Sequence, residues 1–386
     1  MKNLSESEGN QLLQGIKEKG KEQRFCVLGA GNGGMAMAAH LAIMGFRVNL
    51  YNRTPARLQS IIWHGGIQLS GAMEGFGKIE VITSDISEAL EGVDILMVTV
   101  PATAHSFIAR ICAPCLKDGQ IIILNPGRTG GVLEFRKILS DLGMEKKIFL
   151  GETQTFIYAS RTIGPAKSRI FRIKNEVTFA TLPSYWIPGV LTIIRQAFPE
   201  FVPGDNILKT SLDNIGAVFH PALTIFNVSW IEETKGGFDF YLDGLSPSLA
   251  LLLEEVDRER IAVAAALGIK VNSAREWLYQ SYGSYGENLY TAIQFTTAYR
   301  GVRAPESIDH RYIWEDVPAS LVPIVSIGEM LGVPCPMIKT LIYLASVLQG
   351  KDYWREGRTV EKIGIAGLSV KEIRQLVEGV SNPEGI

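Results

Sequence analysis

A glycine-rich turn between two short apolar segments constrains the fold of this chain more than any other feature. Residues 24–28 are mostly apolar, and residues 29–34 read Gly-Ala-Gly-Asn-Gly-Gly. Small residues at 35–42 suit a helix that Gly45 would end, and residues 47–51 form a second apolar segment. A strand, a helix and a second strand within about 30 residues make a βαβ unit, whose two strands are parallel. We therefore predict an α/β domain in which helices cover a parallel sheet.

The rest of the chain separates into a strand-rich part and a helical part. Continuous apolar runs at 93–100 and 120–124 are typical of strands that a parallel sheet buries on both faces. Glycines at turn positions within 67–82 predict a hairpin, and the segments after residue 205 are long and helical. A length of 386 residues suits two domains. The predicted organisation is an N-terminal extension at 1–23, an α/β domain at 24–205 and an all-helical domain at 206–386.

Charge and cysteine content exclude several classes of protein. The chain carries 38 Lys and Arg against 40 Asp and Glu, so we expect no nucleic-acid partner. No stretch approaches the roughly 18 apolar residues of a membrane span, and no apolar signal core begins the chain, so we expect a cytoplasmic protein with no membrane partner. Four cysteines do not make a disulfide scaffold. Cys112 and Cys115 are interpreted as two helix residues, and the five histidines are scattered, so no metal site is expected.

The glycine-rich turn matches the G-x-G-x-x-G pattern of dinucleotide-binding domains. The pattern alone is weak, but here it follows a strand, opens a helix and lies within a βαβ unit. Gly29 would permit the tight turn, Gly31 would let the backbone approach a pyrophosphate, and Gly34 would allow close helix–strand packing. The helix N-terminus would supply N–H donors and a positive dipole end for the phosphates. We therefore predict a Rossmann domain whose turn, including Asn32 and Gly33, binds a nicotinamide dinucleotide.

The end of the second strand indicates which cofactor binds. A carboxylate at this place would bind the ribose 2′-hydroxyl of NAD. The sequence instead has Asn52, Arg53 and Thr54, of which Arg53 could pair with a 2′-phosphate and the other two could donate hydrogen bonds. These residues favour NADP(H), and NAD(H) stays possible if Arg53 is only an exposed loop charge.

Other turns at the carboxyl ends of strands should line the same crevice. Pro101 and His105 follow one strand, where His105 either contacts the cofactor or caps a helix. Glu152 lies at the end of another strand, where it either faces the nicotinamide or serves as a helix-capping or hydrogen-bonding group.

The helical part must supply a proton donor and a substrate anchor. Residues 214–227 form an apolar segment with few polar groups, in which Pro221 should kink the helix beside His220. A buried histidine at a kink is a candidate acid/base because its pKa lies near neutrality, although it could equally be a satisfied core residue. Asn214 and Asn227 are candidate substrate-binding residues of the same segment.

A polar segment at 309–318 precedes an apolar helix. Its Arg311 could bind a substrate carboxylate with two parallel hydrogen bonds, and its Asp316 could orient a histidine. The alternative is a surface loop whose charges cap the following helix.

The chain resembles the opine dehydrogenase family, which includes octopine and nopaline dehydrogenases. The resemblance covers nearly the whole chain after residue 24, and its most specific parts are the helix of His220 and the spacing of Arg311 and Asp316. The matching segments, in order, are 29–42, 50–53, 98–105, 124–131, 214–227, 311–318 and 357–367.

The resemblance implies an oxidoreductase acting on CH–NH donors. An α-keto acid similar to pyruvate condenses with the amino group of an amino acid, and NAD(P)H reduces the resulting imine. By the same resemblance His220 transfers the proton, Asp316 pairs with it, and Arg311 binds a substrate carboxylate.

Other functions are also compatible with the sequence. A ketopantoate reductase-like enzyme, or another NADP oxidoreductase of 2-keto and 2-hydroxy acids, would share the first domain. An opine-type metallophore synthase would differ only in the amine donor, and a non-catalytic NADP-binding sensor would bind cofactor without turnover. The apolar helices at 318–349 could form core or a homodimer surface.

Overall fold

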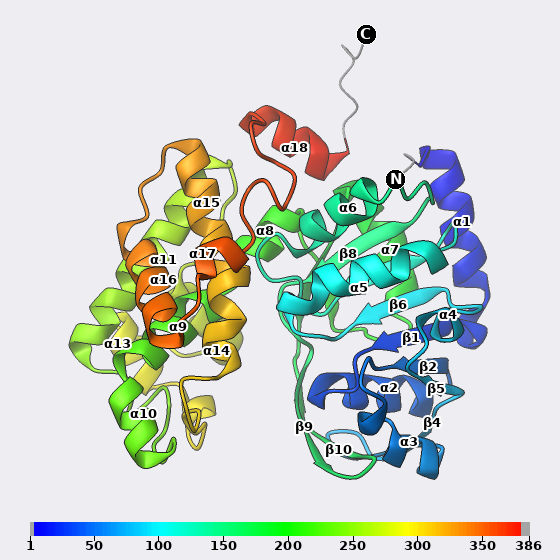
Figure 1. Cartoon of the computed structure of the whole chain (residues 1–386), viewed down its shortest axis with the longest axis horizontal. Coiled ribbons are helices and arrows are strands. Elements are labelled where there is room, and N and C mark those ends of the chain that lie inside the picture. The colour runs from blue at the N-terminus through cyan, green and yellow to red at the C-terminus, as the bar shows by residue number, and fades with distance from the viewer. Residues whose placement is uncertain (1–3, 380–386) are drawn as a thin grey trace. The chain divides into compact units, whose positions relative to one another are not determined.

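The computed structural model describes residues 4–379, which form two compact units. Within these residues, unit 1 comprises residues 4–127, 131–210 and 375–379, and unit 2 comprises residues 128–130 and 211–374. The sequence places a boundary near residue 205, whereas the structure groups residues up to Thr210 with unit 1. Unit 1 has a parallel sheet with helices and unit 2 is built from helices (Figure 1), so the predicted fold class is confirmed.

An eight-stranded sheet forms the centre of unit 1. Its strand order is β12-β11-β8-β7-β6-β1-β2-β5, and all neighbours are parallel except β8 and β11. All four residues of both β6 and β7 are buried, as expected for apolar strands inside a sheet covered on both faces. The strands are β1 Arg24–Leu28, β2 Arg47–Tyr51, β5 Val81–Thr83, β6 Ile95–Val98, β7 Ile121–Leu124, β8 Phe149–Thr153, β11 Val177–Leu182 and β12 Phe201–Pro203.

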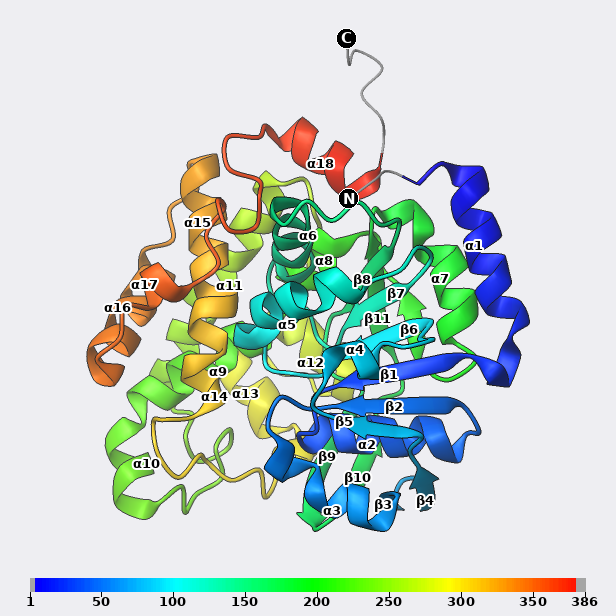
Figure 2. The ribbon, with the colours of Figure 1, turned by 45° about the vertical axis from the view of Figure 1, so that its right-hand side comes forward.

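A second, four-stranded sheet completes unit 1 with the order β4-β3-β10-β9. The predicted hairpin is present as antiparallel β3 and β4, and β3 also pairs in parallel with β10, about a hundred residues later in the chain. Helix α2 contacts β1 and β2 of the first sheet and all four strands of the second, and Figure 2 shows it between them. The strands are β3 Gly66–Gly71, β4 Gly75–Lys78, β9 Tyr158–Gly164 and β10 Lys167–Ile173.

The N-terminal segment, expected as a surface extension, packs onto unit 1. Leu13 and Ile16 of α1 are buried, and a Cβ atom on Gly9 would lie 1.9 Å from the ring of Trp186, so α1 lies closely against the start of α7. The α-helices of unit 1 are α1 Glu6–Glu18, α2 Asn32–Ile43, α3 Gln59–His64, α4 Ile86–Ala89, α5 His105–Cys112, α6 Gly131–Asp141 and α7 Ile187–Ile194. Short 3₁₀ turns are η1 Gly20–Glu22, η2 Pro55–Arg57, η3 Ala102–Ala104, η4 Ala113–Cys115 and η5 Ser184–Trp186.

Unit 2 is organised around α9, which contacts α10, α11, α14 and α16. Residues 207–234, in the part expected to be long and helical, form three helices, α8, α9 and α10, and both α8 and the later α18 cross a boundary between the units in the chain. These helices and those that follow are α8 Ile207–Leu212, α9 Gly216–Phe226, α10 Val228–Thr234, α11 Pro247–Ala266, α12 Ala274–Tyr282, α13 Leu289–Gln294, α14 Arg311–Trp314, α15 Val322–Leu331, α16 Pro336–Gln349, α17 Tyr353–Glu356 and α18 Val370–Glu378. A 3₁₀ turn, η6 Thr297–Tyr299, and a π-helical turn, η7 Val317–Leu321, complete the unit.

Across residues 4–379, no helix combines the length and the apolar character that a membrane crossing requires.

Candidate functional site

The glycine-rich turn of unit 1 has the backbone geometry that a pyrophosphate needs. Gly29 has φ +119°, a backbone conformation that residues with a side chain rarely adopt. Its N–H donates to the Tyr51 carbonyl at 2.8 Å. A Cβ atom on Gly34 would lie 1.7 Å from the Gly29 carbonyl oxygen, so this helix start can approach the turn only without a side chain. At Gly31 no described atom would lie within 4 Å of a Cβ atom, so the backbone there is open to a ligand. The turn therefore fits the phosphates of a dinucleotide at the N-terminus of α2.

The two remaining candidates in this turn lie against the segment after β8. The side-chain oxygen of Asn32 accepts from the Thr162 N–H at 2.9 Å, which ties the start of α2 to β9. A Cβ atom on Gly33 would lie 2.6 Å from the ring of Phe156. These contacts fix the start of α2 beside the glycine-rich turn.

The three candidates after β2 have different surroundings. The Asn52 amide oxygen accepts from the Ala30 N–H at 3.0 Å, and its NH₂ group donates to the Thr54 carbonyl at 3.1 Å. Asn52 therefore links the end of β2 to the glycine-rich turn. Arg53 is exposed, and its guanidinium lies 5.1 Å from the ring centre of Phe107 in α5. Arg53 is accordingly the cation at the end of β2 that can meet a cofactor phosphate.

The candidates at the other strand ends divide into one exposed and two buried residues. Pro101 is exposed just before η3, and His105 is fully buried as the first residue of α5. Glu152 is 1% exposed and accepts from the Val132 N–H of α6 at 3.1 Å and from the Thr210 hydroxyl at 2.7 Å. Glu152 thus makes helix-capping and hydrogen-bonding contacts, and its place beside the nicotinamide stays a prediction.

In unit 2, the structure brings His220 and Asp316 together. His220 lies in α9 directly before Pro221, and its Nδ1 is 2.8 Å from Asp316 Oδ2. Asp316 is fully buried where α14 gives way to the π-helical turn, whereas the His220 side chain is 18% exposed. A histidine paired with a carboxylate on one nitrogen and reachable on its ring can exchange protons with a ligand.

Arg128 is a third member of this cluster that the sequence did not single out. It has φ +60°, is 9% exposed, and places Nη1 2.9 Å from Asp316 Oδ1. Its Nε is 3.6 Å from the carboxylate of Glu315, which is also buried. Burial acts to raise the pKa of Asp316, but the charges of Arg128 and His220 outweigh it, so the pKa lies below its ordinary value. Asp316 is therefore an ionised carboxylate between a guanidinium and an imidazole.

The three candidate substrate-binding residues have other partners. Arg311 is half exposed and bound on one side by Glu315, with N···O distances of 2.8 and 2.6 Å. Asn214 is buried, with its oxygen 3.2 Å from Arg128 and its NH₂ group donating to the Ser320 hydroxyl at 2.8 Å. Arg311 is thus open to a ligand, and Asn214 supports the cluster.

Asn227 caps the end of α9 and does not join the cluster. Its NH₂ group donates to the backbone carbonyls of Leu223 and Gly244 at 2.9 and 2.8 Å.

Two tyrosines surround the His220 ring, and neither was a candidate from the sequence. Tyr241 places its hydroxyl 3.1 Å from His220 Nε2, and Tyr312 stacks on the imidazole at 4.0 Å between ring centres. Tyr241 lies in the loop between α10 and α11, about twenty residues from His220, so no helical spacing connects the two. Only an aromatic-rich stretch, Phe238-Asp239-Phe240-Tyr241, could have marked this loop in the sequence.

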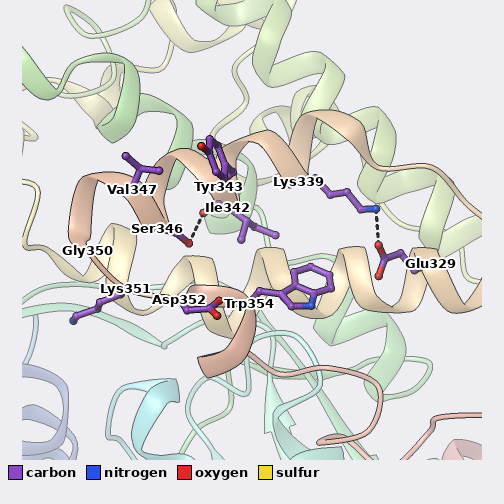
Figure 3. A pocket seen from close by; sticks show the side chains of 10 residues that line it. All are labelled: Glu329, Lys339, Ile342, Tyr343, Ser346, Val347, Gly350, Lys351, Asp352 and Trp354. Atoms are coloured by element: carbon purple, nitrogen blue, oxygen red, sulfur yellow. Dashed lines mark hydrogen bonds and ion pairs between the residues drawn. The ribbon is translucent and has the colours of Figure 1, made fainter.

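A separate pocket of about 530 Å³ lies on the surface of unit 2. Figure 3 shows it beside α16, with Tyr343 and Val347 from that helix and Trp354 from α17. The Glu329–Lys339 ion pair closes one end at 2.5 Å. Its lining residues include none of the His220 cluster. The homodimer expected from residues 318–349, which include this helix, stays a prediction.

The two units together define a class of protein. Unit 1 has the sheet and turn of a nicotinamide-nucleotide-binding domain, and unit 2 carries a buried cluster of His220, Asp316 and Arg128 with the half-exposed Arg311 nearby. This combination is that of an NAD(P)-dependent oxidoreductase.

Comparison with known proteins gives the family. Residues 24–127 match the NAD binding domain of 6-phosphogluconate dehydrogenase, and residues 203–349 match the α-helical domain of NAD/NADP octopine/nopaline dehydrogenase. The chain is 39% identical over 359 residues to an opine dehydrogenase of Arthrobacter sp. (strain 1C), covering 93% of this chain and 99% of that protein. The chain therefore belongs to the opine dehydrogenase family, as the resemblance indicated.

Solved structures agree at the level of the fold. Octopine dehydrogenase in complex with NADH and agmatine superposes with a TM-score of 0.78 at 21% identity, covering 93% of this chain and 99% of that one. Yersinopine dehydrogenase with bound NADP⁺ gives a TM-score of 0.67 at 15% identity, covering 93% and 98%.

Proposed function

We propose that this protein is an NAD(P)H-dependent opine dehydrogenase that condenses an α-keto acid with the amino group of an amino acid and reduces the imine to a secondary amine. The observation that carries the proposal is the buried cluster of His220, Asp316 and Arg128 in the helical unit. Similar solved structures support it, since they are of octopine dehydrogenase with NADH and L-arginine and of octopine dehydrogenase with NADH and pyruvate. A pyruvate-like keto acid is accordingly the proposed acceptor.

The cluster has the properties of a proton donor and acceptor. Because Asp316 is ionised, it accepts the hydrogen of His220 Nδ1, which leaves Nε2 as the nitrogen that exchanges a proton during the reaction. The carboxylate stabilises the imidazolium, and Arg128 keeps the carboxylate charged in a site where burial opposes charge. His220 thus supplies the proton that carbinolamine dehydration needs and recovers one in the oxidative direction.

Substrate anchoring falls to Arg311. Its guanidinium is half exposed, and Glu315 holds it from one side through Nε and Nη2. A guanidinium fixed in this way can bind a carboxylate with little loss of side-chain entropy. Both proposed substrates and the product carry carboxylates, so one such anchor serves the reaction in either direction.

The cofactor proposed is NADP(H). When bound, the nicotinamide supplies the hydride that reduces the imine. The end of β2 has no carboxylate for a ribose 2′-hydroxyl, and the exposed Arg53 fits a 2′-phosphate. Asn52 is engaged with Ala30 and Thr54, which leaves Arg53 as the main determinant of preference among the residues described after β2.

The experiment that tests this function is a matrix of keto acids and amino acids assayed for NADPH and NADH oxidation. We expect oxidation only when both substrates are present, with a secondary amine dicarboxylate as product. Oxidation with keto acid alone would assign a simple keto reductase instead, and cofactor binding without oxidation under any condition would assign a sensor.

A matched pair of variants tests the residue assignment. His220→Asn should lower kcat by about 10²- to 10⁴-fold with NADPH affinity unchanged, because it removes the acid/base and leaves unit 1 intact. His64→Asn makes the same change at an exposed histidine of unit 1 and should leave kcat unchanged. Normal turnover in His220→Asn would show that another group transfers the proton.

A further inference from the structure

Both ring nitrogens of His220 contact protein groups. Nδ1 is 2.8 Å from Asp316 Oδ2, and Nε2 is 3.1 Å from the Tyr241 hydroxyl. An acid/base histidine uses a nitrogen that faces its reactant, yet here Asp316 holds one nitrogen and the phenol of Tyr241 holds the other. A proton leaving His220 from Nε2 therefore meets the Tyr241 oxygen first.

The direction of the second hydrogen bond follows from the charges around it. The ionised Asp316 requires a hydrogen on Nδ1, so the neutral imidazole has a lone pair on Nε2. Burial raises the pKa of Tyr241 well above its ordinary value, so its hydroxyl keeps its hydrogen. Tyr241 is therefore the donor to Nε2 when His220 is neutral, and the acceptor from Nε2 when His220 is protonated.

Packing fixes the Tyr241 ring in this position. The residue is 7% exposed and stacks on Tyr299 with 4.0 Å between ring centres and an interplanar angle of 16°. Its loop is pinned by the Phe240 N–H, which donates to the Val302 carbonyl at 2.8 Å, and by Asp239, whose carboxylate accepts from the Gly301 N–H at 2.9 Å. A phenol held by stacking on Tyr299 and by a hydrogen-bonded loop is pre-organised, and it can pass a proton without reorienting its ring.

We propose that Tyr241 is the terminal carrier of a proton relay, in which protons pass between His220 Nε2 and the substrate through the Tyr241 hydroxyl. In carbinolamine dehydration the nitrogen lone pair forms the C=N bond of the iminium while the C–O bond breaks, and the Tyr241 proton goes to the departing hydroxyl, which leaves as water. The proton on His220 Nε2 moves to the Tyr241 oxygen in the same step. The balance is one proton transferred from the imidazolium to the departing hydroxyl, which gives neutral His220, an iminium and water, with Tyr241 unchanged. The proposal rests on the opine dehydrogenase function.

The test compares Tyr241→Phe with Tyr299→Phe. Both variants remove one hydroxyl from a buried, mutually stacked tyrosine, but only the first removes the group on His220. For the relay we expect Tyr241→Phe to lower the single-turnover rate about 100-fold, the scale of a positioned acid/base group, with substrate KM changed less than threefold. Tyr299→Phe should stay within a fewfold of wild type. Equal losses in both variants, or full activity in Tyr241→Phe, would overturn the relay.

A proton inventory provides a second measurement that does not depend on the variants folding. Two protons move together in the relay, so the wild-type rate plotted against the fraction of D₂O should curve downward, and a straight line would overturn the proposal. His220→Asn separates the two hypotheses. If it is inactive while Tyr241→Phe is fully active, the relay fails and the proposed function stands. If it turns over normally, His220 is not the acid/base and the relay fails, whereas the proposed function fails only if the wild type does not oxidise NADPH or NADH with a keto acid and an amino acid together.

Discussion

Replacing Arg128 with Met should destabilise unit 2 more than replacing an exposed arginine of that unit with Met. The substitution keeps an unbranched side chain at a position with φ +60° and removes the cation from a fully buried carboxylate. Asp316 would lose its ion pair at 2.9 Å, and the Asn214 oxygen would lose its donor at 3.2 Å. In the variant the buried Asp316 carboxylate therefore has one cationic partner fewer, and the Asn214 amide oxygen has lost the Arg128 donor.

The expected loss of unfolding free energy depends on which ion-pair partners the buried carboxylates keep in the variant. Removing one partner of a buried ion pair costs about 3–5 kcal/mol of unfolding free energy. Asp316 keeps His220, and Glu315 keeps Arg311, so we expect the lower end, about 3 kcal/mol. For a unit of roughly 150–250 residues this lowers Tm by roughly 6–12 °C.

The pH dependence of the stability deficit distinguishes an electrostatic cause from a packing defect. In the wild type the folded pKa of Asp316 lies below its ordinary 3.8, so the group stabilises the fold above that pH and the contribution is lost as pH falls through the folded pKa. Without Arg128, burial is less opposed and the folded pKa rises. The variant's deficit is therefore complete above its raised folded pKa and shrinks as pH falls through that pKa. The deficit should be larger at pH 8 than at pH 4.

The assay is urea unfolding followed by tryptophan fluorescence at both pH values. Four of the six tryptophans, Trp230, Trp277, Trp314 and Trp354, lie in unit 2 and report its unfolding. Arg355→Met, at an exposed position of α17, is the control and should change stability by less than about 0.5 kcal/mol. A deficit under about 1 kcal/mol for Arg128→Met, or an equal deficit at both pH values, would refute the electrostatic account.

Three further predictions concern unit 1. Arg53→Ala should raise the KM for NADPH about 10- to 100-fold through loss of a charged hydrogen bond while leaving that for NADH unchanged, and equal effects on both would contradict a 2′-phosphate contact. Gly34→Ala should abolish cofactor binding and lower Tm, because the new Cβ would lie 1.7 Å from the Gly29 carbonyl oxygen. Gly31→Ala has no such contact, so it should weaken cofactor binding in a calorimetric titration and leave Tm unchanged. Burial lowers the pKa of His40 from 6.5 to about 4, so urea stability should fall by about 3 kcal/mol as pH drops from 7 to 4, and His40→Asn should reduce that slope.

The sheet of unit 1 was largely predictable because its signals are local. Apolar runs at 93–100 and 120–124 became β6 and β7, and the glycine-rich turn lies where the pattern placed it. The pairing of β3 with β10 left no such signal. The two segments are about a hundred residues apart, and nothing local in either one identifies the other as its partner strand.

The candidate site was likewise only partly predictable from local sequence. Local pattern made His220 a candidate because of Pro221, and a family resemblance connected it to Asp316. Arg128 lies in the segment 124–131, which the sequence marked as part of the family resemblance and placed in the α/β domain, yet the structure groups residues 128–130 with unit 2. Tyr241 had no motif at all.

The amino-acid sequence by itself determined the α/β and helical character of the two units, the phosphate-binding turn, and the residue types available for acid/base work. These depend on side-chain periodicity and on glycine conformations, which are properties of short segments. Tertiary structure alone decided that Asp316 shares its charge between His220 and Arg128, and that a phenol covers the second imidazole nitrogen. Those outcomes depend on distances of about 3 Å between residues far apart in the chain, and on burial that strengthens each charge interaction.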